Sequence, residues 1–148
     1  MWGLVLRPTS TKTLPAAASY AQCPAMTFAQ LETLATPVVA GVIRRLPAPL
    51  REPAAGVAVH FEPLPGDDVL AEGFTDDILG LFTGYAHGTE LSEDQSLPPQ
   101  IMLYLENLWD FAEGDPAVFR DEVRLTYLHE LGHFFGWDED DLAARGLD

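Results

Sequence analysis

The chain has 148 residues, 47% of them hydrophobic, which suffices for one core of ordinary size and gives no reason to expect a second domain. Its net charge of -15 would repel phosphate backbones, so we expect no nucleic-acid partner. The single cysteine, Cys23, excludes an internal disulfide framework and a zinc site built from thiolates.

The acidic residues are concentrated in the second part of the chain. Residues 1–60 carry five Lys and Arg against two Asp and Glu, whereas residues 61–148 carry three against twenty-one. Such a charge keeps a small protein soluble and monomeric, and we expect a monomer. The N-terminal apolar run 2–6 is too short for a signal-peptide core or a membrane span. With one cysteine, this predicts a cytoplasmic protein with no membrane association.

Residues 1–25 are rich in Thr, Ser, Pro and Ala and have no sustained periodicity. We predict that they form a poorly ordered or non-native N-terminal extension. The single domain is then 26–148, and Met26 is a candidate start codon.

The domain is predicted to begin with a long helix. Apolar residues recur at helical spacing up to Leu46, and Thr27 with Gln30 matches a capping box. Pro37 lacks an amide donor and should kink or restart this helix. The prolines at 47, 49 and 53 then indicate a loop.

Three stretches are predicted as strands. Residues 57–62 and 101–106 alternate between apolar and polar side chains, and 78–85 is a weaker candidate bounded by glycines. The stretch 87–99 is predicted as a long loop and is a candidate lid, because long loops often carry function.

The last helix has well-marked ends. Asp115 can cap it, Pro116 suits its first position and Gly136 suits a left-handed stop. The predicted helix spans 116–135. Its buried side is predicted to comprise Val118, Val123, Leu128, Leu131 and Phe135.

This helix carries an HExxH motif at 129–133. Residues four apart lie one turn above each other, so His129 and His133 can bind one metal ion. Glu130 lies on the flank of the same face, where its carboxylate can take a proton from a zinc-activated water as the general base. The spacing therefore predicts a zinc-dependent hydrolase.

A catalytic zinc usually takes three protein ligands. A glycine can end the helix at residue 136 and let the chain turn back toward the metal. Glu139, three residues later, is then the predicted third ligand, and Asp138 or Asp140 is a less favoured alternative. The acidic run 138–141 can also begin a further helix, because negative charge is favoured in a first turn. The two roles can coexist.

Other polar residues have predicted roles outside the ligand set. Thr126 and Glu122 precede His129 on the same stripe and could orient the histidines. We place His60 in a strand and His87 in a loop, outside the site. The oxyanion-stabilising residue is open, with Tyr104 and Tyr127 as candidates by their chemistry.

Residues 26–148 resemble the minimal zincin-like metallopeptidases, a bacterial family of small proteins. The likeness rests on 80–84, 99–104 and especially 122–136. It implies an α+β domain with a reduced matrix-metalloproteinase-like fold, in which a short sheet packs on helices and the metal site lies on the long C-terminal helix.

The resemblance also implies His129 and His133 as metal ligands and Glu130 as general base. Two departures stand out. Members of the family commonly have Asp where this chain has Glu139, and no methionine follows Met102, although larger metzincins place a methionine-containing turn beneath the metal.

We therefore predict a zinc peptidase whose peptide or protein substrate pairs with an exposed sheet edge. One alternative is a non-catalytic, metal-stabilised module that binds a peptide or protein. The other is a metal-dependent RNA hydrolase, against which the acidity of the chain argues.

Overall fold

The computed structural model describes residues 3–5, 25–88 and 97–145, although nothing is described of the side chains of 3–5 and Glu139. The elements are, in chain order, β1 Gly3–Val5, α1 Phe28–Arg45, α2 Ala48–Ala55, β2 Ala58–Glu62, α3 Asp67–Ala71, β3 Gly80–Thr83, β4 Gln100–Tyr104, α4 Leu105–Phe111, α5 Pro116–Phe134 and α6 Glu139–Ala144. Mixed helices and strands confirm the predicted α+β class.

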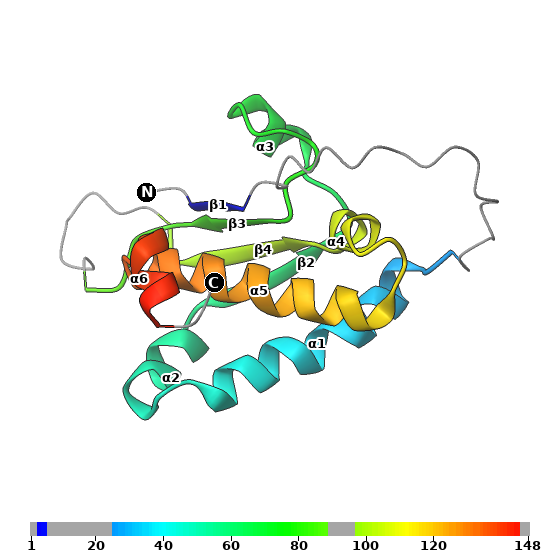
Figure 1. The fold of residues 1–148 in the computed structure, drawn as a ribbon. Coiled ribbons are helices and arrows are strands. Elements are labelled where there is room, and N and C mark those ends of the chain that lie inside the picture. The colour runs from blue at the N-terminus through cyan, green and yellow to red at the C-terminus, as the bar shows by residue number, and fades with distance from the viewer. Residues whose placement is uncertain (1–2, 6–24, 89–96, 146–148) are drawn as a thin grey trace.

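A four-stranded sheet in the order β1-β3-β4-β2 forms one layer of the fold. β2 runs parallel to β4, whereas β3 is antiparallel to both β4 and β1. The long helices α1 and α5 contact each other and cover one face of this sheet (Figure 1). Within the described part of the chain, no helix has the length and apolar character to cross a membrane.

The main core lies between the sheet and the two long helices. It contains Leu31, Ile101, Leu103, Val123 and Tyr127, all buried. A smaller cluster of Ile78, Leu81 and Tyr104 lies with partly buried residues of α3 and the segment after it. The main core fixes α5 against β3 and β4, and the position of α5 decides where its motif lies.

Several predicted elements are confirmed. The Gln30 amide donates to Thr27 Oγ1 over 3.2 Å, and the Thr27 amide donates to Gln30 Oε1 over 2.9 Å, which completes the predicted capping box. α5 begins after Asp115, whose carboxylate accepts hydrogen bonds from two amides of the first turn. β2 and β3 lie within their predicted stretches.

Other predictions need correction. The strand predicted over 101–106 ends at Tyr104, and α4 begins at once. The buried Leu105 and Leu108 have helical spacing, and the Asn107 side chain donates to the carbonyls of Asp76 and Ile78, each over 2.8 Å. Tertiary contacts therefore override the alternating pattern.

The proline-rich stretch after α1 also differs from prediction. It forms α2, not a loop. Pro49 lies in the first turn, where an amide would have no intrahelical partner, whereas Pro53 lies inside the helix. α1 is one helix through Pro37, so no second helix starts there. On α5, the predicted core residue Val118 is 41% exposed, and the neighbouring Phe119 is fully buried in its place.

The predicted N-terminal extension lies largely outside the described residues. Within it, Gly3–Val5 form β1, which pairs with β3. The domain boundary at Met26 remains a prediction. The predicted loop 87–99 also falls mostly on residues that are not described.

Candidate metal centre

The two histidines of the HExxH motif face each other on α5. The ring centroids of His129 and His133 are 4.8 Å apart, and the ring planes cross at 71°. The Nε2 atoms of both rings are buried. Two imidazoles that lie one helical turn apart and have buried Nε2 atoms form a pair of ligands suited to zinc.

Glu130 lies between these histidines in sequence and is completely buried. Both of its carboxylate oxygens are withdrawn from bulk water. Burial of a charged carboxylate costs free energy unless its surroundings compensate the charge. A buried carboxylate next to the motif histidines in sequence therefore indicates a functional role.

β3 lies directly on this part of α5 because residue 80 is glycine. A Cβ at Gly80 would stand 2.7 Å from Thr126 Cγ2, 3.2 Å from Glu130 Cγ and 3.3 Å from the Met102 carbonyl oxygen. From the sequence, Gly80 was predicted only to bound a strand, not to allow this contact. A glycine inside a strand pattern can mark close approach of another segment, and that was the available signal.

The end of α5 is a Schellman turn. Gly136 has φ +76°, the Trp137 amide donates to the Gly132 carbonyl over 2.9 Å, and the Gly136 amide donates to the His133 carbonyl over 3.0 Å. This confirms Gly136 as the predicted stop. The turn brings the acidic segment after Gly136 back toward α5.

α6 then packs on α5 at another glycine. A Cβ at Gly132 would stand 2.6 Å from Leu142 Cδ2, so only glycine leaves room for that side chain without a shift. Leu142 is 1% exposed. Gly132 inside the motif thus positions the helix that begins at the candidate third ligand, a role that the sequence analysis missed.

The acidic run does begin a helix, as predicted. Asp138 is the N-cap of α6, its Oδ1 accepting from the Asp141 amide over 2.8 Å, and Asp141 Oδ2 accepts from the Asp138 amide over 3.3 Å. The cap engages the Asp138 carboxylate, which disfavours it as a ligand. Asp140 is exposed.

Glu139 is the first residue of α6, and its side chain is not described. Within the described residues, no group of three His, Cys, Asp or Glu side chains is arranged to hold an ion. The histidine pair fits zinc as two of its ligands, and the third remains a prediction.

The two residues predicted to orient the histidines lie on α5 in different surroundings. Thr126 is 2% exposed and lies against Gly80. Glu122 is half-buried, and its pKa is raised by burial and by the neighbouring Asp121, against the opposing effect of Arg124. Their orienting role remains a prediction.

The candidate oxyanion residues are both buried tyrosines. Burial raises the pKa of Tyr127 to about 12. The pKa of Tyr104 is also raised to about 12, first by burial and then by the negative charges of Asp68, Glu62 and Glu130. Neither hydroxyl has a hydrogen-bond partner among the described residues. Both therefore stay protonated at neutral pH, but the described contacts place neither against the two histidines.

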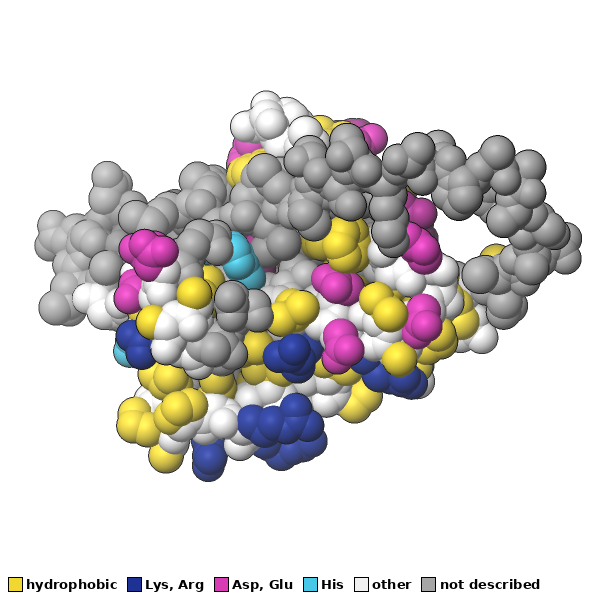
Figure 2. Space-filling model, viewed as in Figure 1, with side chains coloured by type: hydrophobic (Ala, Val, Ile, Leu, Met, Phe, Trp, Pro, Cys, Tyr) yellow, Lys and Arg dark blue, Asp and Glu magenta, His cyan; other side chains and the backbone are white. Residues whose placement is uncertain are grey.

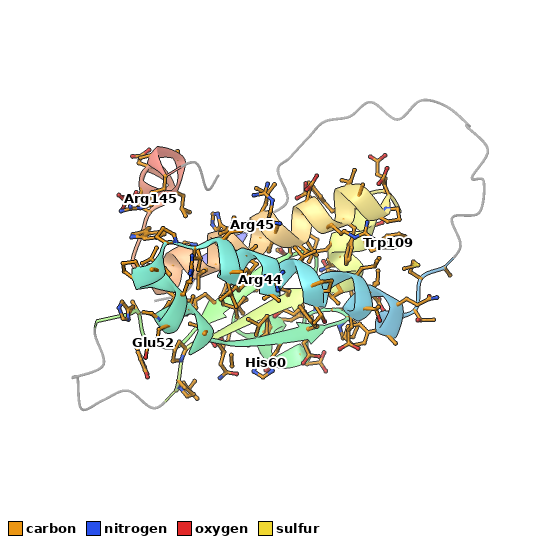
Figure 3. The ribbon with its side chains drawn as sticks, turned by 90° about the horizontal axis from the view of Figure 1, so that it is seen from below. Arg44, Arg45, Glu52, His60, Trp109 and Arg145 are labelled. Carbon is orange, nitrogen blue, oxygen red and sulfur yellow. The ribbon has the colours of Figure 1, made fainter. Side chains whose placement is uncertain are left out.

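The remaining two histidines lie on other elements than the pair. His60 is on β2, on the side of the sheet away from α5 (Figure 3), and lines a cavity with Glu62 and Asp68. The His87 ring packs on Phe134 and Phe135 at centroid distances of 5.5 and 5.8 Å. His60 is thus in a strand and His87 in a loop, as predicted, and their exclusion from the site remains a prediction.

Comparison with known families identifies the family of this chain. The sequence model of a family described as zincin-like metallopeptidase matches residues 54–147. The chain belongs to the zincin-like metallopeptidases. The match covers the strands β2, β3 and β4 and the motif helix α5 of this zincin-like chain. A comparison with curated proteins finds no match. Membership supports a zinc-dependent hydrolase of the metallopeptidase class.

Proposed function

We propose that this zincin-like chain is a zinc peptidase in which His129, His133 and Glu139 hold the metal and Glu130 is the general base. The complete burial of Glu130 against β3, on the helix that carries the two histidines, carries the proposal. When bound, zinc would supply a water of lowered pKa and would polarise the substrate carbonyl.

The residues of the chain have distinct tasks in this reaction. Glu130 accepts the proton of the attacking water and then delivers it to the leaving amine, as a buried carboxylate next to the reacting atoms can do. The imidazoles of His129 and His133 are held by their helix, so their geometry is set before substrate arrives. The sheet over Glu130 shields this proton from bulk water.

The pairing of β1 with β3 supports an extended peptide as substrate. β1 lies antiparallel to β3 with Gly3 opposite Phe82, Leu4 opposite Leu81 and Val5 opposite Gly80. Gly80 is the residue that lies over Glu130. A peptide that takes this edge would therefore pass the general base while backbone hydrogen bonds align it.

The same pairing favours a second candidate function. An edge that already holds a segment of its own chain could equally bind a partner strand without cleaving it. The chain would then be a metal-stabilised peptide-binding module, and it would bind unstructured peptides without turnover.

The decisive variant is Glu130→Gln, which keeps the size of the side chain but removes the base. Zinc content by elemental analysis should match the wild type, and cleavage of a peptide library should fall by at least about 100-fold, as general-base catalysis contributes. If both proteins cleave the library equally fast, Glu130 is not the general base. A wild type that binds zinc and peptides but cleaves none favours the binding module.

The ligand assignment is tested separately with His129→Ala. This variant should lose the stoichiometric zinc of the wild type, because a single remaining histidine and one carboxylate hold zinc weakly. A wild type that takes up no zinc even when it is supplied would remove the basis for hydrolysis.

A further inference from the structure

A cavity of about 300 Å³ opens in the helical layer of the fold, among α1, α2, α5 and α6. It lies outside the metal centre. Its lining residues are Val42, Arg45, Leu46, Pro47, Leu50, Arg124, Leu128, Trp137 and Arg145.

The helical phase of α5 separates this cavity from the histidine pair. Successive residues of an α-helix are rotated by about 100°, so Arg124 and His133 point in opposite directions and Leu128 is about 100° from His129. Gly132 lies between these two sides of α5, and Leu142 of α6 packs on it. The cavity is therefore not a part of the catalytic cleft.

Three arginines, which come from three different elements, surround the apolar lining. The chain has only eight Lys and Arg, and Arg45, Arg124 and Arg145 converge here from α1, α5 and the end of α6. Figure 2 shows basic side chains gathered over the lower helical layer, with hydrophobic surface between them. In Figure 3, Arg45 and Arg145 lie on the side of α1 that faces α5 and α6.

One of these guanidinium groups has a described acidic neighbour, because Arg124 lies close enough to Glu122 to act on the pKa of its carboxyl. Neither Arg45 nor Arg124 forms an ion pair with a described residue, and Arg145 lies over the Trp137 ring at 4.2 Å from its centroid. In a chain of net charge -15, three such arginines around one cavity are a local exception that favours an anion.

The side chains of the lining also restrict the chemistry of the ligand. They offer guanidinium and indole donors and aliphatic surface, and none of them carries a hydrogen-bond acceptor. A carboxylate accepts hydrogen bonds and donates none, so it matches this lining. A peptide segment would bring backbone N–H groups for which these side chains have no acceptor.

We propose that this cavity binds a small amphiphilic anion, a carboxylate on an apolar body. The arginines would hold the carboxylate by charge-assisted hydrogen bonds. The aliphatic side chains of α1, α2 and Leu128 would bury its apolar part. A volume of about 300 Å³ is at the small end of ligand pockets, which suits a medium-chain carboxylate.

Arg44 and Arg45 provide a matched pair for the test. They are neighbours on α1 and are both exposed, but only Arg45 lines the cavity. We would titrate the full chain with decanoate by isothermal calorimetry, below the concentration at which decanoate forms micelles. One saturable site should be seen in the wild type and in Arg44→Gln, and Arg45→Gln should weaken binding by about 10-fold or more.

The requirement for both parts of the ligand is tested with decanol and inorganic phosphate. Each has only one of the two features and should bind at least about 10-fold more weakly than decanoate. Arg124→Gln repeats the test from a second element, and circular dichroism would show that each variant is folded. Because neither substitution touches the histidine pair, this test is independent of peptidase activity.

Four outcomes would overturn the proposal. The first is no binding of decanoate to the full chain, and the second is equal weakening by Arg44→Gln and Arg45→Gln, which would mean diffuse charge attraction. The third is that decanoate binds only to a chain that ends at Arg145, which would mean that residues 146–148 occupy the cavity in the full chain. The fourth is preferential binding of an acidic peptide over decanoate.

Discussion

Gly80 of β3 lies so close to Glu130 of α5 that a Cβ at residue 80 would stand 3.2 Å from Glu130 Cγ. This approach sets the separation between the sheet and the motif helix. It also explains how Glu130 becomes fully buried although it lies next to the histidines. The contact links the strand proposed to align the peptide with the residue proposed to move the proton.

Gly80→Ala should destabilise the fold and reduce activity together. The new Cβ would meet Thr126 Cγ2 at 2.7 Å, and such overpacking costs about 1–3 kcal/mol of unfolding free energy. Urea unfolding and peptide turnover would measure the two effects. The matched control is Gly80→Ala combined with Thr126→Ser, which removes Cγ2 and should restore most of the stability. If the double variant is no more stable than Gly80→Ala, the contact with Thr126 is not the cause.

Substitutions of Asp138 and Glu139 should have separate effects, one on the capping of α6 and the other on metal binding. Asp138→Ala removes the cap of α6 and should lower stability by about 1 kcal/mol, with little change in zinc content. Glu139→Ala should reduce zinc affinity by far more than it reduces stability. Thermal unfolding of the metal-free proteins and zinc titration would compare the two. The reverse pattern, with zinc lost in Asp138→Ala alone, would make Asp138 the ligand.

Removal of β1 should open the edge of β3. A chain that lacks residues 1–5 has no strand opposite Gly80, so peptides should bind without first displacing β1 and KM should fall, with kcat less affected. A chain that lacks only residues 1–2 keeps β1 and is the control. Equal KM values in the two truncated chains would show that β1 does not compete with substrate.

Stability should fall at alkaline pH because of the buried tyrosines. Burial raises the pKa of Tyr127 from 10.0 to about 12, so the unfolded chain loses this proton first. The stabilisation is present below pH 10 and is lost as the pH rises toward 12. The slope is about 1.4 kcal/mol of unfolding free energy per pH unit for one such group. Urea unfolding between pH 9 and 11 should show a smaller slope for Tyr127→Phe, and an unchanged slope contradicts the shift.

Local sequence determined the parts of this protein that depend on residues near each other in the chain. The capping box at Thr27, the N-cap at Asp115 and the glycine stop at Gly136 each involve contacts within a few residues. The spacing of His129 and His133 is likewise a property of one helix. This is why the motif helix and the closeness of its two histidines could be predicted.

Tertiary structure decided what depends on contacts between distant segments. α4 replaces the end of a predicted strand because Asn107 binds carbonyls of the segment before β3. Phe119 lies in the core in place of Val118, whereas Val123 is buried as predicted. The burial of Glu130 required Gly80, 50 residues earlier in the sequence. The arginine-lined cavity required four helices to meet. No local pattern encodes such meetings, because their energy comes from packing between segments that only the folded chain brings together.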